Sequence, residues 1–255
     1  MTDVEVAAAA ARAAAAVLTG LRDEGRLTGR ALGDAGDAAA QAAIAGVLTE
    51  QRPGDAVFSE EAIDDRRRLS ADRVWIVDPL DGTREYGEAP RPDWAVHVAL
   101  WSAGERGVGG DLVAGAVALP ALGEVLVTDP APVVPPPGGG RPRIAVSRSR
   151  PPAVAATAAA ALDAELVPMG SAGWKVTAVV RGEADAYVHA GGMYQWDSAA
   201  PVAVARAAGL TAVRLDGSAL VYNGPDAWLP DLLVCRPELT DRLLAAVGGG
   251  SQPPR

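Results

Sequence analysis

RVWIVDPLDGT, residues Arg73–Thr83, is the stretch of sequence that decides the fold. Its first five residues, RVWIV, form a short apolar run, which predicts a buried β-strand. The strand is expected to end in a turn at Asp78-Pro79, because proline fixes its own backbone and restricts the residue before it. Ligands of open α/β sheets bind beyond the carboxyl ends of strands, so an acidic residue at this point predicts a ligand site.

Before and after this strand, the first half of the chain combines helical sequence with several further strands. Helical patterning covers Val4–Asp23 and Ala38–Gln51. Apolar runs predict strands at Trp94–Trp101, Val113–Leu119 and Gly123–Val127, the last two paired as a hairpin. This half therefore has the pattern of an α+β domain.

The second half alternates short strands with helices, which predicts a layered α/β domain. The expected strands are Ile144–Ser147, Leu166–Pro168, Ala186–Val188, Thr211–Arg214 and Leu232–Cys235. The expected helices are Pro152–Ala164, Gly173–Arg181, Ser198–Ala208 and Glu238–Val247.

Two segments rich in proline and glycine interrupt these patterns. Residues 129–142, DPAPVVPPPGGGRP, can continue neither a helix nor a central strand. We therefore expect a linker here, between an N-terminal subdomain of residues 1–130 and a C-terminal subdomain of residues 141–247. Residues 248–255, GGGSQPPR, are expected to be a disordered tail.

Composition and charge exclude several classes of protein. The 255 residues are 49% hydrophobic, enough for a substantial core, and the formal net charge is −9. That charge argues against a nucleic acid polymer as partner, because neutralising a phosphate backbone takes clustered Lys and Arg. Cys235 is the one cysteine, so no internal disulfide can form. No segment is expected to cross a membrane, and the Ala-rich N-terminus lacks the basic start of a signal peptide, so we expect a cytoplasmic protein.

Acidic residues at four places are candidates for chemistry. They are Asp37, the pair Glu60-Glu61, Asp78 with Asp81, and Asp197. Taken singly, Asp37 and Asp197 could each cap the helix that follows, and Glu60 could be a solvated residue at a strand end. The aspartates of DPLDGT are harder to explain structurally, since two nearby carboxylates repel each other unless a cation lies between them.

Mg²⁺ is the cation that such a site suits, because it takes oxygen ligands from one or two carboxylates together with substrate phosphate. Gly82 allows close approach of the backbone, and Thr83 adds a hydroxyl at a point where the free N–H groups of a helix start could bind phosphate. Haloacid-dehalogenase phosphatases carry a similar D-x-D-G-T motif. There the two aspartates are two positions apart, whereas Asp78 and Asp81 are three apart.

Three motifs together resemble the magnesium-dependent, lithium-sensitive inositol monophosphatase superfamily. They are FSEE (Phe58–Glu61), WIVDPLDGTREY (Trp75–Tyr86) and WDSAAP (Trp196–Pro201), and the resemblance covers residues 5–245. The REY that follows DGT is similar to the CysQ-like 3′(2′),5′-bisphosphate nucleotidases of actinobacteria. The resemblance implies a sugar-phosphatase fold, a sandwich of alternating α-β-α-β-α layers with two subdomains, and a homodimer.

The resemblance also implies roles for individual residues. Two or three Mg²⁺ ions would be held by Glu60, Asp78, the backbone carbonyl of Leu80, Asp81 and Asp197. Asp37 and Thr83 would orient and deprotonate the attacking water, with Asp34 as a competing candidate for the role of Asp37. The backbone N–H groups of Gly82 and Thr83 would bind the scissile phosphate.

Lys175 is expected to face the substrate, because GSAGWK (Gly170–Lys175) resembles a substrate-facing nucleotidase segment that here includes Ser171. It is the one lysine of a chain that otherwise uses arginine, and a compact ammonium is not equivalent to a planar guanidinium at a crowded phosphate. Ser147 and Arg148 resemble a second such segment. Arg148 is expected to pair with a second phosphate, the alternative being an exposed loop arginine.

The resemblance implies a phosphatase that converts 3′-phosphoadenosine 5′-phosphate to AMP and phosphate, with 3′-phosphoadenosine 5′-phosphosulfate as a further substrate, in sulfate assimilation. A first alternative is an inositol-1-phosphate or fructose-1,6-bisphosphate phosphatase of the same superfamily. A second is a non-catalytic binding protein on this scaffold. His97 and Cys235, both in apolar runs, are expected to be structural.

Overall fold

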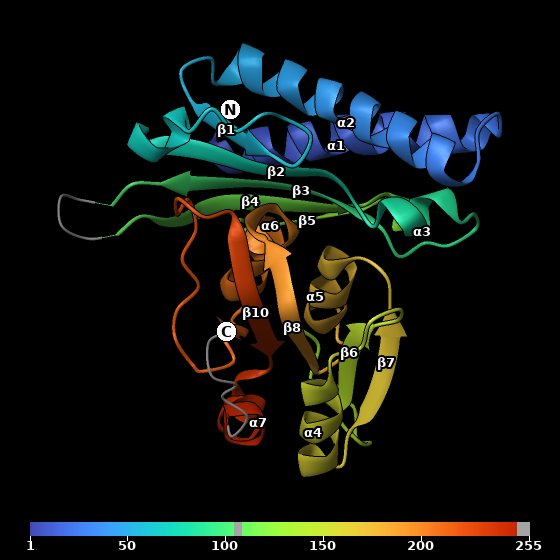
Figure 1. Cartoon of the computed structure of the whole chain (residues 1–255), viewed down its shortest axis with the longest axis vertical. Coiled ribbons are helices and arrows are strands. Elements are labelled where there is room, and N and C mark those ends of the chain that lie inside the picture. Colours follow the sequence, from blue (N-terminus) through green and yellow to red (C-terminus); the bar gives the residue numbers. More distant parts are fainter. Residues whose placement is uncertain (105–108, 249–255) are drawn as a thin grey trace.

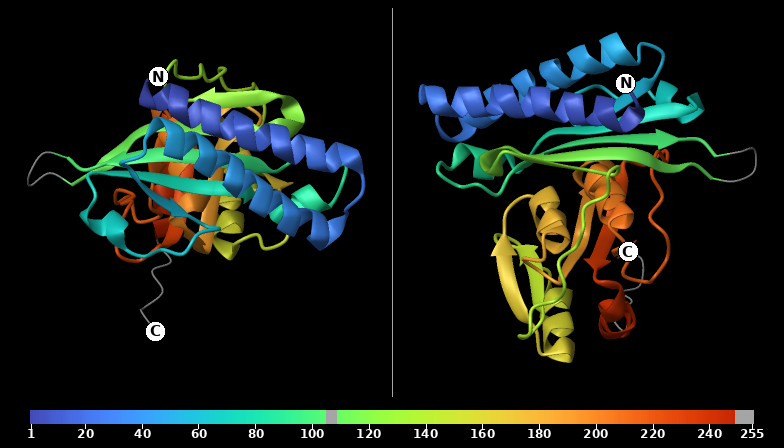
Figure 2. Two further views of the ribbon diagram at one scale, coloured as in Figure 1. Left: turned by 90° about the horizontal axis from the view of Figure 1, so that it is seen from above. Right: turned by 180° about the vertical axis from the view of Figure 1, so that it is seen from behind.

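The computed structural model describes residues 1–104 and 109–248. Two five-stranded sheets alternate with three layers of helices, as Figure 1 shows. Helices α1 (Asp3–Glu24) and α2 (Gly29–Gln51) cover the outer face of the first sheet, which is clearest in the view from above in Figure 2. Between the sheets lie α5 (Ala172–Val180) and α6 (Gln195–Ala207), and below the second sheet lie α4 (Ala153–Leu162) and α7 (Thr240–Val247). The expected α-β-α-β-α sandwich is confirmed.

The first sheet has the strand order β1-β2-β3-β4-β5. Its strands are β1 (Ala56–Ser59), β2 (Arg73–Asp81), β3 (Ala95–Ser102), β4 (Asp111–Leu119) and β5 (Glu124–Val127). β1 is parallel to β2, and the remaining pairs are antiparallel, with the predicted β4–β5 hairpin present. The short helix α3 (Thr83–Gly87) follows β2 directly.

The second sheet has the order β7-β6-β8-β10-β9. Its strands are β6 (Arg143–Ser147), β7 (Glu165–Met169), β8 (Ala186–Tyr194), β9 (Thr211–Val213) and β10 (Trp228–Cys235). β6 runs parallel to β7 and β8, whereas β10 is antiparallel to β8 and β9. Each strand and helix expected in the second half therefore has a counterpart, although β8 extends six residues beyond the prediction to Tyr194.

Apolar side chains fill each space between layers. Val6, Ile44 and Trp75 belong to the cluster between the first helical layer and the first sheet. Phe58, Val176 and Val204 belong to the cluster between the two sheets, which includes α5 and α6, and a third cluster lies beneath the second sheet. Because the central cluster contains side chains from both sheets, it fixes how the two sheets face each other across the site described below.

Helix α1 corrects one expectation from the sequence. It is 22 residues long and contains an 18-residue window with a mean hydropathy of 1.5, so by length and composition it could cross a membrane, contrary to the expectation that no segment could. In the structure one face of the helix packs against α2 and the first sheet, with Leu18 fully buried, and its ends carry charged residues such as Asp3 and Arg22. These features favour a core helix.

Helix α2 begins nine residues before the predicted start at Ala38, and its glycines explain the error. Glycine lowers helix propensity, so the segment GRALGDAG resembled a loop. A Cβ atom at Gly33 would lie 2.7 Å from Thr83 Cγ2, and one at Gly36 would lie 2.7 Å from Tyr86 Cε1. These two glycines let α2 pack closely against α3, so the tertiary contact, and not local propensity, decides where the helix begins.

Two further boundaries differ from the prediction in ways that matter for the site. β2 does not end in a turn at Asp78 but continues to Asp81, with an irregularity in its pairing to β3 between these two residues. Helix α6 begins at Gln195, so Asp197 lies inside its first turn. Residues 129–142 contain neither helix nor strand, and the predicted tail lies, apart from Gly248, outside the described residues.

Candidate metal and phosphate site

The irregularity in β2 brings both aspartates of DPLDGT to one side of the first sheet. Asp78 pairs with His97 on β3, and the regular ladder resumes only at Asp81, opposite Ala95. Such a bulge bends the strand and redirects its side chains. Asp78 is 1% exposed, and its Oδ1 accepts a hydrogen bond from the backbone N–H of Leu80 at 3.0 Å.

Glu60 reaches the same place from the neighbouring strand. It follows the end of β1, and its backbone N–H donates to the carbonyl of Val77 at 3.3 Å, next to Asp78. Ser59, before it, donates its hydroxyl to Gln41 Oε1 of α2 at 2.7 Å. The FSEE segment is therefore fixed between β2 and α2, with Glu60 at the solvent-accessible edge.

Asp197 comes to the site from the layer between the sheets. In the first turn of α6, its Oδ2 accepts the backbone N–H of Tyr194 at 2.7 Å, as part of a capping box. Asp197 therefore helps to cap α6, but from the third helical position, and Tyr194 is the N-cap in place of the Asp197 that the sequence suggested. The charge of Asp197 also helps to raise the pKa of Asp78, and the charge of Asp81 helps to raise the pKa of Asp197.

Asp81 is held by the N-terminus of α5. Its oxygens accept the hydroxyl of Ser171 at 2.5 Å and the backbone N–H groups of Ala172 at 3.2 Å and Gly173 at 2.6 Å. His97 Nε2 lies 3.3 Å from Asp81 Oδ2. Free N–H groups and the helix dipole both favour a negative charge at this position.

Three of these carboxylates, Glu60, Asp78 and Asp197, have raised pKa values. Burial is the first cause for each shifted group, and the neighbouring negative charges are the next: the pKa of Asp197 rises to about 8, that of Glu60 to about 7, and that of Asp78 well above its usual range. Asp78 Oδ2 is buried and has no hydrogen-bond partner among the described residues.

A divalent cation fits this arrangement. An orphaned carboxylate oxygen surrounded by further carboxylates is costly without an opposite charge. Within residues 1–104 and 109–248, no three Asp, Glu, His or Cys side chains already form a closed cage, because Asp81 and Asp197 are turned toward backbone N–H groups. For all four carboxylates to coordinate one cluster of ions, the side chains of Asp81 and Asp197 would have to rotate away from these N–H groups.

Asp37, Thr83 and Leu80 meet at the edge of the carboxylate group. Thr83 Oγ1 lies 3.4 Å from Asp37 Oδ1 and donates to the carbonyl of Leu80 at 3.1 Å. Partial burial and then the charges of Glu61 and Glu60 raise the pKa of Asp37 to about 7. The suggestion that Asp37 caps the following helix is wrong, because α2 already began at Gly29.

Asp34, the competing candidate, lies elsewhere on the same helix. Its side chain is exposed, and its nearest cation is Arg30 at 3.6 Å. The geometry therefore favours Asp37 over Asp34 for any role beside Thr83.

A cavity of about 230 Å³ opens beside the carboxylates and collects most of the residues expected to contact substrate. Its lining includes Asp81, Gly82, Ser147, Arg148, Ser171, Lys175 and Asp197. Gly82 has φ +87°, a conformation that side chains disfavour, and a Cβ atom there would lie 3.1 Å from Ser171 Cβ. Thr83 is not part of this lining and faces Asp37 instead.

Lys175 lies at the base of this cavity, almost completely buried. Its Nζ donates to the carbonyls of Gly170 and Ser171 and lies 5.2 Å from the centre of the Tyr187 ring. Burial lowers its pKa to about 8, against the opposing effect of Asp81 and other acids. An ammonium has three donors, so a third remains for a ligand in the cavity.

Arg148 is not an exposed loop arginine. It donates to Glu85 Oε1 and to Glu88 Oε2, both at 2.6 Å, and so joins the loop after β6 to the region of α3. Among the other expected residues, Ser147 accepts the backbone N–H of Arg150 at 3.2 Å. Cys235 is buried, as expected for a structural residue.

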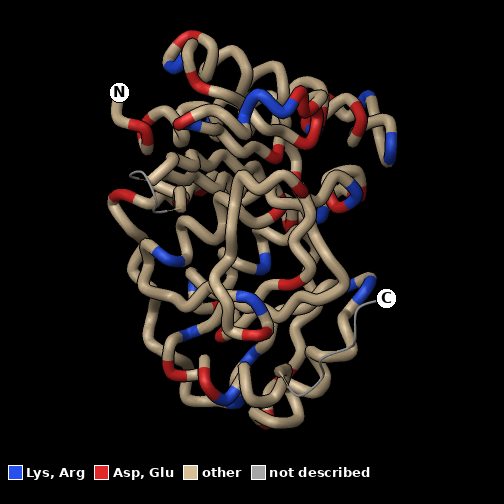
Figure 3. Tube along the Cα trace, turned by 60° about the vertical axis from the view of Figure 1, so that its left-hand side comes forward, with Lys and Arg blue, Asp and Glu red and all other residues tan. Residues whose placement is uncertain are grey.

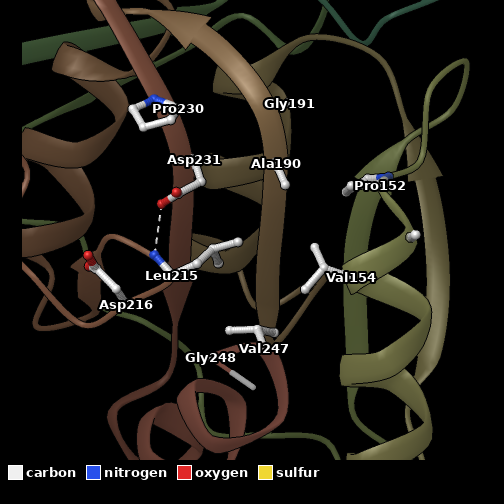
Figure 4. Close-up of a pocket in the computed structure, with 11 residues that line it drawn as sticks. Pro152, Val154, Ala190, Gly191, Leu215, Asp216, Pro230, Asp231, Val247 and Gly248 are labelled. Atoms are coloured by element: carbon white, nitrogen blue, oxygen red, sulfur yellow. Dashed lines mark hydrogen bonds between the residues drawn. The ribbon is translucent and has the colours of Figure 1, made fainter. Parts of the chain in front are cut away.

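A larger cavity, about 820 Å³, lies apart from this chemistry, between α4 and α7 (Figure 4). It has two aspartates in its lining, and both are already engaged. Asp231 accepts the backbone N–H of Leu215 at 2.8 Å and pairs with Arg214, and Asp216 binds Ser218. Size alone therefore does not mark the candidate active site.

Some residues around the site were missed from the sequence. His97, expected to be only structural, lies between Asp78 and Asp81, and burial lowers its pKa. Asp93 accepts the backbone N–H of Gly170 at 2.6 Å and thereby anchors the loop before α5. Alternation in the β3 sequence pointed to a core position for His97, but no local pattern indicated the role of Asp93.

The chain is similar to known proteins over most of its length. The profile of the Inositol monophosphatase family matches residues 1–131 and 141–250. The 3′-phosphoadenosine 5′-phosphate phosphatase of Mycobacterium leprae is 49% identical over 254 residues, which cover 97% of this chain and 94% of that protein. The protein of the same name from Mycobacterium bovis is 52% identical over 219 residues, which cover 85% of this chain and 82% of that protein.

Solved structures share the fold. Inositol monophosphatase II from Staphylococcus aureus superposes with a TM-score of 0.80 at 20% identity, covering 98% of this chain and 94% of that one. CysQ from Bacteroides thetaiotaomicron superposes with a TM-score of 0.76 at 24% identity, covering 92% of this chain and 97% of that one. Sequence profile, relatives and architecture therefore agree, and the chain belongs to the inositol monophosphatase family of phosphatases.

Proposed function

We propose that this enzyme is a Mg²⁺-dependent phosphatase that removes the 3′-phosphate of 3′-phosphoadenosine 5′-phosphate, giving AMP and phosphate. The 5′-phosphosulfate analogue is a further candidate substrate. The observation that carries the proposal is the group formed by Glu60, Asp78, Asp81 and Asp197 beside a cavity that contains Lys175 and Arg148. The two mycobacterial relatives, whose names state this substrate, support it.

The chain's own residues would divide the work of hydrolysis. Glu60, Asp78, the Leu80 carbonyl, Asp81 and Asp197 would hold two or three Mg²⁺ ions. When bound, Mg²⁺ lowers the pKa of water and stabilises charge on the attacking and leaving oxygens.

Water attack also needs a group to take a proton and groups to hold the phosphate. Asp37, oriented by Thr83, would accept the proton of the attacking water. The N–H groups of Gly82 and Thr83 would bind the phosphate while its bond to O3′ breaks, and O3′ would leave as a hydroxyl after taking up a proton from solvent water.

Substrate choice tests the proposal directly. We expect the catalytic efficiency of Mg²⁺-dependent phosphate release to be higher with 3′-phosphoadenosine 5′-phosphate than with inositol 1-phosphate or fructose 1,6-bisphosphate. A clear preference for either of these two esters would instead identify an inositol-1-phosphate or fructose-1,6-bisphosphate phosphatase. No release from any of the three esters, despite tight binding of one, would favour a non-catalytic binding protein.

Arg148 offers a sharper test of a second phosphate subsite. Arg148→Met should raise the KM for the bisphosphate nucleotide about tenfold, because one charge-assisted contact is lost, while the KM for inositol 1-phosphate, which has one phosphate, changes little. Arg141→Met is the matched control, since Arg141 is exposed and pairs with Asp163 away from the cavity. Equal KM changes for both substrates would contradict a role in recognising the second phosphate.

The remaining expectations concern partners and location. We propose a cytoplasmic homodimer that binds a small nucleotide and no nucleic acid polymer. Figure 3 supports the last point, because basic and acidic positions are interspersed along the trace. Light scattering would measure the oligomeric state, and a lithium dose series at saturating Mg²⁺ would test the inhibition that the family resemblance implies.

A further inference from the structure

Arg68, eight residues after Glu60, is buried and fully engaged. Its side chain is 2% exposed, and one terminal nitrogen donates to Asn223 Oδ1 and to the carbonyl of Gly224, both at 2.9 Å. The other guanidinium nitrogens donate to Asp64 Oδ2 at 3.0 and 2.9 Å. The guanidinium carbon lies 3.8 Å from the centre of the Phe58 ring. Burying an arginine in this way is tolerated only because every donor group has a partner.

Asn223 carries the connection to helix α6. It lies in the loop before β10, with a φ of +57° that asparagine tolerates better than most residues. Its Nδ2 donates back to the carbonyl of Arg68 at 3.2 Å, and its backbone N–H donates to Gln195 Oε1 at 2.7 Å. Gln195, the first residue of α6, is buried and donates to the carbonyl of Asp226 at 2.6 Å.

An aromatic contact runs beside this network. The rings of Phe58 and Trp196 meet edge to face, with centroids 5.1 Å apart. Phe58 is two residues before Glu60, and Trp196 directly precedes Asp197. The network and the aromatic pair therefore link two stretches of backbone. One lies beside Glu60, just after β1, and the other lies beside Asp197, at the start of α6.

We propose that this Arg68–Asn223–Gln195 network is a positioning device that sets the separation of Glu60 and Asp197 and thereby the affinity of the site for divalent cations. None of its three members lines the cavity beside the carboxylates. Two carboxylates on different layers repel each other, so a rigid link must hold them near the spacing that a cation requires. The inference rests on the proposed metal-dependent function.

The test compares Arg68→Lys and Asn223→Gly with the control Arg67→Lys. Lysine keeps the charge but not the planar fork, and glycine keeps the positive φ but not the side-chain amide. Arg67 is the neighbouring arginine, 88% exposed and paired only with Asp65 among the described residues. Mn²⁺ binding is measured on the substrate-free protein by the loss of its free-ion electron paramagnetic resonance signal, and Mg²⁺ activation is measured with the nucleotide.

Both network variants should bind Mn²⁺ about 10- to 100-fold more weakly, as is typical when a group that orients a metal ligand is removed. The Mg²⁺ concentration for half-maximal activity should rise in parallel, while kcat at saturating Mg²⁺ recovers. Arg67→Lys should match the unsubstituted protein. A KM for nucleotide that stays constant at saturating Mg²⁺ would separate this effect from damage to the cavity.

A lowered melting temperature with unchanged Mn²⁺ affinity in both network variants would overturn the inference, as would an equal loss of affinity in the control. If Arg68→Lys does not fold, Asn223→Gly decides the outcome, because its backbone conformation suits glycine. If the unsubstituted protein itself binds no Mn²⁺ and needs no metal, the proposed function fails instead.

Discussion

Asp78→Asn is expected to abolish phosphate release and, in the presence of a chelator, to make the protein more stable. Asp78 is 1% exposed, and its Oδ2 has no hydrogen-bond partner among the described residues. An amide would keep the Oδ1 contact with Leu80, remove one buried negative charge and offer a donor to Glu60. Turnover should fall by about 10²–10³-fold or more, the scale of losing one group that stabilises charge in the transition state.

The gain in stability should be visible as a higher melting temperature. A buried, unsatisfied polar group costs about 1–3 kcal/mol, more when it is charged. For a protein of this size about 1 kcal/mol corresponds to ~2–4 °C. The difference in melting temperature between Asp78→Asn and the unsubstituted protein should widen as pH rises above about 4. Burial and nearby acids raise the pKa of Asp78, so its ionisation opposes folding.

Asp81→Asn is the informative comparison, since the two aspartates have opposite surroundings. Asp81 accepts the hydroxyl of Ser171 and the backbone N–H of Gly173, and an amide group would place its own N–H against these donors. We therefore expect Asp81→Asn to be inactive and less stable in chelator, where Asp78→Asn is inactive and more stable. Scanning calorimetry in chelator measures both melting temperatures. If the two variants shift the melting temperature in the same direction, the contacts described for Asp78 and Asp81 are wrong.

The buried strand that leads into DPLDGT could be predicted because its signal is local. An apolar run followed by proline, glycine and acidic residues indicates a buried strand and a ligand site without knowledge of the rest of the chain. The bulge between Asp78 and Asp81 could not be predicted, because it depends on register with His97 and Ala95 of β3. The sequence placed a turn where the structure continues the strand.

Local sequence patterns could not predict that residues far apart in the chain meet at the site. Glu60 and Asp197 stood out as acidic residues, but their role as metal ligands came from the resemblance of motifs, and only the packing of α6 against the first sheet shows that their charges interact. Arg68 and Asn223 are 155 residues apart and carry no motif. The start of α2 was missed for a related reason, because Gly33 reads as a helix breaker until its contact with Thr83 is seen.

Replacing Asp37, but not Asp34, is expected to cause a large loss of kcat. Asp37→Asn should lower kcat by about 10²–10⁴-fold, the usual contribution of a positioned general base. Asp34→Asn should leave kcat unchanged, because Asp34 is exposed on the same helix and pairs with Arg30. The measurement is steady-state phosphate release at saturating Mg²⁺ and nucleotide, with Mn²⁺ binding as a check that the metal site is intact.

Asparagine at position 37 makes this a test of proton transfer more than of packing. The amide has the size of the carboxylate and can still accept a hydrogen bond from Thr83, so the contact between α2 and α3 at Gly33 and Gly36 is preserved. What it loses is the ability to take up a proton from water. A large drop in kcat with unchanged KM and Mn²⁺ affinity therefore identifies Asp37 as the base, whereas a drop in Asp34→Asn alone would assign that role to its neighbour one helical turn away.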